Sequence, residues 1–345
     1  MKQPIYLSLL TAAFSLSKPG CAQHAVGPEN PPAYHRQLWK SKYTRPESIP
    51  FPPDNQFTAA RELLGRTLFF DPRLSGSNSV SCATCHNPGF AWGDALPKAI
   101  GRGTKQLRRR TPTLLNLAWA ELLFWDGRAD SLEQQALGPI ESHEEMNRPL
   151  DELPRVLGCI PEYRELFERA YPQEPPTSKL VARALATFER TIVSGQAPFD
   201  EWISGRESAI SESAKRGFDL FNTKAGCQKC HTQWNFTDNG FHDIGLPDDD
   251  TGRGKELPLE AMQHAFKTPT LRDVDRRAPY LHNGSVATLE EVIDLYDLGG
   301  LAKRPSLSPE LVPLHLTAQE KIDLLAFLHT LTSHAKPVEL PALPR

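Results

Sequence analysis

The sequence has 345 residues, which is long enough for two domains of ordinary size. Its formal net charge of -3 lacks the basic excess of nucleic-acid-binding proteins, so we expect no nucleic-acid partner. The 31 proline and 22 glycine residues indicate frequent breaks between helices, and after the N-terminal segment no apolar run is long enough to cross a membrane.

Residues 1–22 have the pattern of a signal peptide. Lys2 supplies a positive end, residues 5–16 supply an apolar core, and the small residues around Cys21 offer a cleavage site after Ala22. Attachment of a lipid to Cys21 is the alternative, but Lys18 stands where a lipoprotein signal has an aliphatic residue. We therefore expect export to the periplasm without a lipid anchor.

The pattern of the remaining chain predicts a mainly α fold. Residues 23–55 are rich in proline and polar residues and predict an extended arm on the surface. Apolar spacing or capping residues predict five helices: 57–68, 178–193, and segments that begin near Ser211, Thr288 and Thr317. In the last helix Ile322, Leu325 and Leu328 are expected to face inward. No strand pattern of useful length appears.

Two short motifs carry the strongest chemical signal. Residues 82–86 (CATCH) and 227–231 (CQKCH) both match C-x-x-C-H, the attachment pattern of c-type haem, and each follows a predicted helix, which indicates a weak internal duplication. Two thiols on one turn can bond to the two vinyl groups of a porphyrin, and the adjacent histidine then reaches the iron. The motifs predict six haem-binding residues: Cys82, Cys85, His86, Cys227, Cys230 and His231. A zinc site built from both cysteine pairs, or a redox dithiol, is the alternative.

Four further stretches resemble the bacterial di-haem cytochrome c peroxidase and MauG family. They are residues 68–75, 124–129, 132–140 and 278–284, within a similarity that covers 57–331. The resemblance implies two cytochrome c-like helical domains, which we place at 56–205 and 206–335. It also implies that His86 is the proximal ligand of a reactive haem in the first domain. His231 would be the proximal ligand of an electron-transfer haem in the second.

The resemblance further implies a pocket in which peroxide reacts. Gln135, Pro139 and Glu145 match the family positions that line this pocket, and Glu145 would move a proton between the two peroxide oxygens. Trp125 matches the tryptophan that lies between the two haems in the family. Judged without the resemblance, Glu145 is a solvated charge and Trp125 is a core residue.

The chain departs from many cytochrome c peroxidases at both irons. Those proteins have a histidine that blocks the reactive iron until the second haem is reduced, whereas this chain has Arg102, so we expect an open reactive haem. Where they supply methionine to the second iron, this chain has Tyr296, as in the MauG-like branch, with Met262 or His264 as the alternative ligand. A phenolate favours higher oxidation states of iron than methionine does.

A calcium ion between the domains is often present in the family, held by an asparagine side chain before a Thr-Pro-Thr stretch and by nearby carbonyls. Arg110 holds the asparagine position here, and a cation cannot ligate calcium. The carbonyl groups of Arg277 and Pro279 could still contribute. The sequence therefore predicts two covalent c-type haems and puts an interdomain calcium in question.

These features predict an enzyme that oxidises a protein electron donor, or side chains of a protein substrate, with hydrogen peroxide in the manner of MauG. One alternative is a cytochrome c peroxidase that removes peroxide with electrons from a small cytochrome or cupredoxin. A second is a non-enzymatic di-haem electron-transfer cytochrome, in which Met146 would cap the first iron and Met262 the second.

Overall fold

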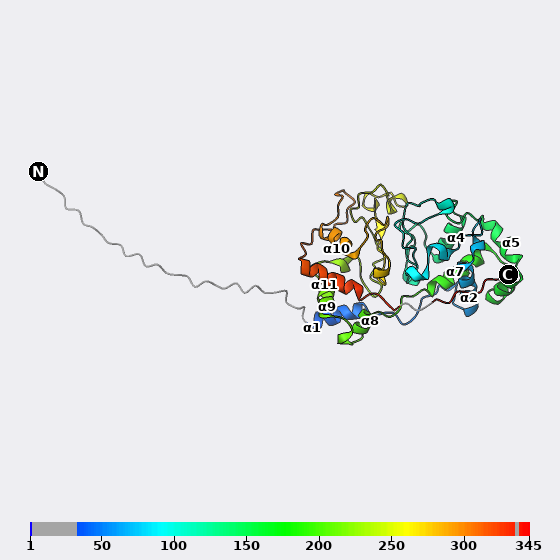
Figure 1. The fold of residues 1–345 in the computed structure, drawn as a ribbon, viewed down its shortest axis with the longest axis horizontal. Coiled ribbons are helices and arrows are strands. Elements are labelled where there is room, and N and C mark those ends of the chain that lie inside the picture. The colour runs from blue at the N-terminus through cyan, green and yellow to red at the C-terminus, as the bar shows by residue number, and fades with distance from the viewer. Residues whose placement is uncertain (2–32, 335–337) are drawn as a thin grey trace.

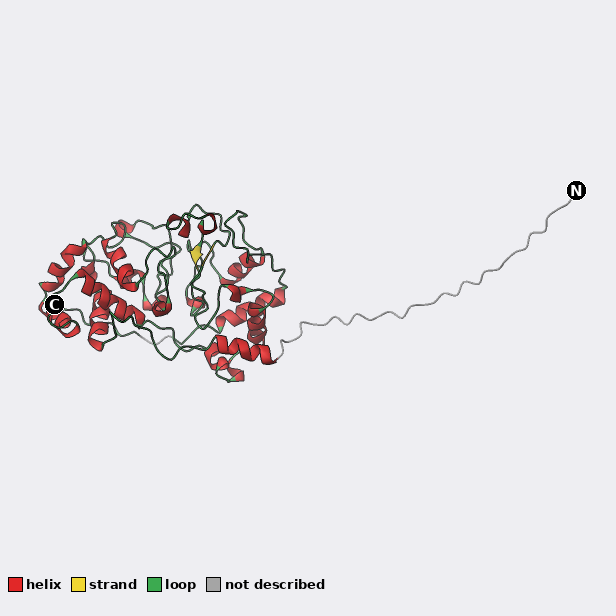
Figure 2. Cartoon of the chain, turned by 180° about the vertical axis from the view of Figure 1, so that it is seen from behind, coloured by secondary structure: helices red, strands yellow, loops and turns green. Residues whose placement is uncertain are grey.

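The computed structural model describes Met1, residues 33–334 and residues 338–345. Apart from Met1, the predicted signal peptide therefore lies outside the described residues. Helices dominate the described chain and one small sheet accompanies them, which confirms the mainly α class (Figure 2). None of the described helices is long and apolar enough to cross a membrane.

The α-helices are separated by long loops that contain short 3-10 helices. In chain order the α-helices are α1 (Ala33–Lys42), α2 (Ala59–Phe70), α3 (Cys82–Cys85), α4 (Leu132–Glu141), α5 (Leu153–Gly158), α6 (Pro161–Ala170), α7 (Ser178–Arg190), α8 (Pro198–Ile203), α9 (Glu212–Asn222), α10 (Leu289–Asp297) and α11 (Ala318–His329). The 3-10 helices include η1 (Pro72–Leu74), η7 (Cys227–Lys229) and η9 (Glu260–Met262). The strands β1 (Phe241–His242) and β2 (Phe266–Lys267) pair antiparallel, with Phe241 opposite Lys267.

The helices form two lobes, and each lobe has its own apolar core (Figure 1). Helices α2 and α4 to α7 surround the first core, whereas α1 and α8 to α11 surround the second. Helix α8 precedes the boundary that the sequence predicted at residues 205 and 206, yet its Phe199 and Trp202 are fully buried in the second core. The packing therefore changes lobe earlier, between Ile192 and Phe199.

Each lobe contains the same close crossing of two helices. In the first, Gly65 of α2 lies against α7, and an added Cβ would stand 1.9 Å from the carbonyl oxygen of Ala184. In the second, Gly217 of α9 lies against α11, and an added Cβ would stand 1.9 Å from the carbonyl oxygen of Asp323. In both lobes the helix with the glycine precedes the C-x-x-C-H motif, so the weak duplication in the sequence corresponds to a repeated structural unit.

The predicted helix starts are confirmed by their capping contacts, but one predicted buried face is partly wrong. Thr288 and Glu291 form a capping box at the start of α10, and Thr317 and Glu320 form one at the start of α11. Ile322 of α11 is 55% exposed, contrary to the prediction. The buried apolar residues of this helix are Leu324, Phe327 and Leu328. Two residues correspond to about 200° around a helix, so a face that buries Leu324 turns Ile322 outward.

The N-terminal arm is not extended throughout, which corrects the prediction for residues 23–55. Helix α1 forms within this segment, and Tyr43 directly after it is fully buried in the second core. The Tyr43 ring stacks on Phe236 with 4.9 Å between the ring centroids, and Trp39 packs against the same core. Trp39 and Tyr43 are four residues apart and therefore lie on one helical face. The high proline content obscured this short apolar stripe.

The C-terminal residues 338–345 return to the first lobe, where Figure 1 shows the chain end close to α2 and α5. Val338 packs against the first core, and the guanidinium of Arg73 donates a hydrogen bond of 2.8 Å to the carbonyl oxygen of Pro344. Helix α1 thus packs on the second lobe, whereas residues 338–345 pack on the first.

Candidate active site

One cavity of about 720 Å³ is lined by residues of both lobes and by both C-x-x-C-H motifs. Every site residue that the sequence predicted lines this cavity. These residues are Cys82, Cys85 and His86, Cys227, Cys230 and His231, and Trp125, Gln135, Pro139, Glu145 and Tyr296. The fold thus brings residues from distant parts of the chain to one shared space.

The first motif presents a histidine that is oriented for iron ligation. Helix α3 carries Cys82 and Cys85, and His86 follows at its C-terminal end. The Nδ1 atom of His86 lies 3.1 Å from the carbonyl oxygen of Trp92. A carbonyl can only accept, so Nδ1 donates and the lone pair of Nε2 remains free for a metal. Burial lowers the pKa of His86, which favours the neutral imidazole that ligates iron.

The second motif repeats this arrangement. The Nδ1 atom of His231 donates to the carbonyl oxygen of Phe236 at 3.0 Å, and burial lowers the pKa of His231 as well. Both accepting residues have left-handed backbone conformations, with φ of 62° at Trp92 and 52° at Phe236. Each motif therefore offers two thiols and one fixed, neutral imidazole, the donor set that a c-type haem requires.

The described residues do not support a zinc site made from both cysteine pairs. Within 33–334 and 338–345, the only group of three close metal-ligating side chains consists of Cys230, Asp238 and His242. This group contains a single cysteine. The Nε2 atom of His242 lies 2.8 Å from the Asp238 carboxylate, and this hydrogen bond is the main cause that raises the pKa of His242 to about 10. A protonated imidazole has no lone pair for zinc.

Two adjacent acidic residues differ in where their side chains point. Glu144 lies at the surface and forms an ion pair with Lys105. Burial raises the pKa of the Cys85 thiol to about 11, and the nearby carboxylates of Asp94 and Glu145 add to this effect, so Glu145 is turned toward the first motif. Burial also raises the pKa of Glu145 itself. A partly buried carboxyl group with a raised pKa is suited to proton transfer.

Helix α4 supplies the other residues predicted for the peroxide pocket. Gln135 and Pro139 are four residues apart and line the cavity from one face of this helix. Met146 also lines the cavity, and its backbone N–H donates to the carbonyl oxygen of Pro139 at 3.1 Å. The polar side chains of Gln135 and Glu145 therefore stand beside apolar ones in this part of the wall.

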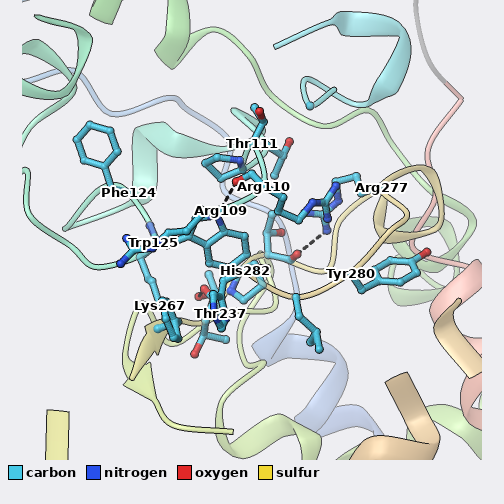
Figure 3. Close-up of a pocket in the computed structure, with 18 of the residues that line it drawn as sticks. Arg109, Arg110, Thr111, Phe124, Trp125, Thr237, Lys267, Arg277, Tyr280 and His282 are labelled. Carbon is cyan, nitrogen blue, oxygen red and sulfur yellow. Dashed lines mark hydrogen bonds between the residues drawn. The ribbon is translucent and has the colours of Figure 1, made fainter. Parts of the chain in front are cut away.

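Trp125 is held by hydrogen bonds that come from both lobes. Its indole N–H donates to the carbonyl oxygen of Arg110 at 3.0 Å, and its own carbonyl oxygen accepts from the backbone N–H of Lys267 at 2.9 Å. Its ring packs edge-on against His282, with 6.4 Å between the centroids. Figure 3 shows these side chains gathered in one part of the cavity. The ring therefore has a fixed position in the wall of the cavity that both motifs line.

Tyr296 of α10 faces the second motif. Burial raises the pKa of its phenol, and the thiols of Cys230 and Cys227 are close enough to add to this effect. Met262 and His264, the alternative ligands for the second iron, do not line the cavity. The imidazole of His264 is instead hydrogen-bonded to the carbonyl oxygen of Asp250 at 2.9 Å.

Comparisons with known proteins agree with this geometry. A family model described as di-haem cytochrome c peroxidase matches residues 59–208. The methylamine utilization protein MauG of Methylorubrum extorquens is 52% identical over 309 residues, which cover 88% of this chain and 87% of that protein. The chain belongs to the di-haem cytochrome c peroxidase family.

Further members of this family show the same relation. The methylamine utilization protein MauG of Methylophilus methylotrophus is 46% identical over 309 residues, which cover 88% of this chain and 92% of that protein. Among solved structures, a MauG-like protein associated with microbial copper homeostasis superposes with a TM-score of 0.77 at 32% identity, over 84% of this chain and 95% of that chain. As a family member, the chain is a di-haem peroxidase with two c-type haems.

The loop after the first motif carries Arg102 at the position where many cytochrome c peroxidases have a histidine. Arg102 is exposed and does not line the cavity. Its backbone N–H donates to the carbonyl oxygen of Glu144 at 2.7 Å, which fixes the loop against the cavity rim. The side chain at this position is therefore directed away from the first motif.

The cavity wall also contains buried charged groups that were not anticipated from the sequence, among them Glu189 and Arg277. Glu189 of α7 is 4% exposed, its Oε2 atom has no hydrogen-bond partner, and burial raises its pKa to about 8. Arg277 is 8% exposed and forms no ion pair with any described residue. Glu189 lies four residues after Leu185 on the apolar face of α7, and this periodicity was the signal that could have found it.

Proposed function

We propose that this di-haem peroxidase uses hydrogen peroxide to remove electrons from side chains of a partner protein, as expected for the MauG-like branch of the family. The observation that carries the proposal is the position of Tyr296 in the cavity wall beside the second motif. A phenolate oxygen favours ferric and higher oxidation states of iron. Such a ligand suits the storage of oxidising equivalents better than the acceptance of electrons from a high-potential cytochrome.

The proposed assembly consists of two cytochrome c-like domains, each with one covalent haem. Cys82 and Cys85 bond to the first haem and Cys227 and Cys230 to the second, while His86, His231 and Tyr296 act as iron ligands. When bound, the two haems supply redox-active iron that takes up the two oxidising equivalents of peroxide. The free Nε2 atoms of both histidines support this assignment.

In the reactive pocket, Glu145 takes a proton from one oxygen of peroxide and returns it to the other as the bond between them breaks. The amide of Gln135 orients the peroxide by hydrogen bonding, and Pro139 keeps the adjoining wall apolar. One peroxide molecule takes up two electrons and two protons and becomes two molecules of water. The two electrons come from the partner protein.

Trp125 passes electrons between the two halves of the cavity through its aromatic ring. Hydrogen bonds from both lobes hold this ring in place. Arg102 lies outside the cavity, so no side chain from that position closes the first iron. The reactive site is therefore open without prior reduction of the second haem.

The protein acts in the periplasm after export directed by residues 1–22. Its substrate is a protein, and the names of the two MauG relatives support a partner that takes part in methylamine utilization. A strain that lacks this chain should lose growth on methylamine and keep growth on other carbon sources. Unchanged growth on methylamine would remove this part of the proposal.

The test is the electron paramagnetic resonance spectrum of the oxidised holoprotein before and after one equivalent of hydrogen peroxide. We expect one high-spin and one low-spin ferric signal at rest and the loss of both after peroxide. Tyr296→Phe should keep two covalent haems but lose the response of the second. Tyr171→Phe is the matched control, because it removes a buried phenol that does not line the cavity.

Three results would contradict the proposal in different ways. Two low-spin signals that are indifferent to peroxide would identify an electron-transfer cytochrome. If Tyr296→Phe has the same spectra as the wild type, both before and after peroxide, Tyr296 is not an iron ligand. Rapid turnover with a reduced small cytochrome, without oxidation of protein side chains, would assign the chain to peroxide removal.

A further inference from the structure

Arg110 is a buried cation without a counter-charge from the described chain. Its side chain is 9% exposed, it forms no ion pair with any described residue, and its Nε atom has no hydrogen-bond partner. The carboxylate that acts on its pKa belongs to Asp94, which already accepts a hydrogen bond of 2.6 Å from the hydroxyl of Thr111. A buried charge is costly unless it is paired, so this guanidinium requires an anion from outside the described chain.

Arg277 is a second buried cation close to the first. Its guanidinium donates only to backbone carbonyl groups, to Thr270 at 2.5 Å and to Asp273 at 3.3 Å. The carboxylate of Asp273 is turned toward Ser333, whose N–H and hydroxyl donate to it at 2.7 and 2.8 Å. Burial, together with the nearby charge of Arg110, lowers the pKa of Arg277 to about 10. Two positive charges thus share one wall of the cavity.

The backbone of Arg110 fixes this charge beside Trp125. The carbonyl oxygen of Arg110 accepts the indole N–H of Trp125 at 3.0 Å, and its N–H donates to the carbonyl oxygen of His282 at 2.8 Å. Figure 3 shows Arg110 and Arg277 in the same part of the cavity as Trp125 and His282. The two unpaired cations therefore line the part of the cavity that also contains Trp125 and His282.

We propose that Arg110, which is held beside Trp125, together with Arg277 would supply the counter-charge for haem carboxylates, and that the guanidinium of Arg110 replaces an interdomain calcium ion. Each c-type haem brings two carboxylates, and a guanidinium binds carboxylates through a planar pair of N–H donors. Calcium needs six to eight oxygen ligands, and a guanidinium offers none. The inference rests on the two haems of the family and does not depend on the proposed protein substrate.

A covalent cation differs from a bound ion in its consequences. A chelator can remove calcium, but it cannot remove Arg110, so the properties of both haems should be independent of calcium. A nearby positive charge also disfavours the ferric state, which carries one more positive charge than the ferrous state. Loss of the Arg110 charge should therefore lower the reduction potential of at least one haem.

The test compares the haem reduction potentials of the wild-type holoprotein, Arg110→Gln and Arg110→Lys by spectroelectrochemical titration, without peroxide. We expect a shift to lower potential in Arg110→Gln and wild-type potentials in Arg110→Lys, which keeps the charge. Arg276→Gln is the matched control, because it removes an exposed arginine next to Arg277 in the chain that does not line the cavity. Its potentials should not change, since solvent and salt screen an exposed charge.

Calcium content provides a readout that does not need a variant. The purified wild-type holoprotein should contain no stoichiometric calcium, and a chelator should leave its potentials and its paramagnetic resonance spectrum unchanged. One calcium ion per chain, or unchanged potentials in Arg110→Gln, would overturn the inference. If Arg110→Gln does not incorporate haem, the reduction potentials of Arg110→Lys and the calcium content test the inference. Lowered potentials in Arg110→Lys, which keeps the charge, would overturn the inference.

Discussion

The hydroxyl group of Tyr43 donates a hydrogen bond of 3.0 Å to the side-chain oxygen of Asn222, inside the second lobe. Asn222 is the last residue of α9, five positions before the second haem motif. Its amide in turn donates to the carbonyl oxygen of Phe218 at 2.8 Å. The N-terminal segment is therefore part of the core that supports the second motif.

Replacement of Tyr43 should destabilise this lobe in two steps of different size. Tyr43→Ala removes a fully buried ring and should lower the free energy of unfolding by about 3–5 kcal/mol, whereas Tyr43→Phe removes one hydrogen bond and should cost about 1 kcal/mol. Urea unfolding of the holoprotein measures both. The exposed neighbour Lys42→Ala is the control and should change little. Equal stability of Tyr43→Ala and Lys42→Ala would show that the arm is dispensable.

The two glycine crossings should respond in parallel to an added methyl group. In Gly65→Ala and Gly217→Ala the new Cβ would meet a carbonyl oxygen, so each helix pair must separate, at a cost of about 1–3 kcal/mol or more. Thermal unfolding reports this loss. Gly158→Ala is the control, because apart from its chain neighbours and its own helix backbone no atom lies within 4 Å of its added Cβ. Stability equal to wild type in either crossing variant would contradict the close approach of the helices.

Glu145 should be required for the reaction with peroxide, whereas its neighbour should not. Glu145→Gln keeps the size of the side chain but cannot carry a proton, so the rate constant for the reaction with peroxide should fall by about 10²–10⁴-fold. Stopped-flow absorbance of the haems measures this rate. Glu144→Gln alters an exposed carboxylate at the edge of the same cavity that is paired with Lys105, and this variant should react at nearly the wild-type rate. Similar losses in both variants would indicate a general effect of charge.

The pH dependence of that rate follows from the burial of Glu145. Its carboxylate form accepts the proton, and burial raises its pKa above the ordinary value. The rate should therefore rise with pH through this raised pKa and should fall on acidification at a higher pH than for an exposed glutamate. Glu145→Gln should lose this inflection, and an unchanged inflection in that variant would assign it to another group.

Glu189 should make stability depend on pH. Burial raises the pKa of Glu189 to about 8. Its contribution to the free energy of unfolding is therefore fully present below the pKa that Glu189 has in the unfolded chain, and it is lost as pH rises through 8. Glu189→Gln removes this titration, so the difference in unfolding free energy between variant and wild type should grow in favour of the variant from acidic pH to pH 9. The exposed Glu162→Gln should show a nearly constant difference. A flat difference for Glu189→Gln would mean that a bound group compensates its charge.

Local patterns in the sequence predict the haem attachment sites and determine several helix boundaries of this protein. The spacing of Cys82, Cys85 and His86, and the same spacing in the second motif, predicts haem attachment because both thiols and the imidazole act within one turn. The capping box of Thr288 and Glu291 was predictable for the same reason, since its atoms lie within four residues. Where the pattern extends over a longer range, as for Ile322, the packing of a neighbouring helix decided the buried face.

Only the tertiary structure decided how the groups around the cavity are paired and charged. The carbonyl oxygens of Trp92 and Phe236 reach the two histidines because of left-handed loop residues that no periodicity reveals. The unpaired charges of Arg110 and Arg277 and the burial of Glu189 arise from segments far apart in the chain. Burial and ion pairing depend on which distant atoms exclude water from a group, and a sequence does not state those distances.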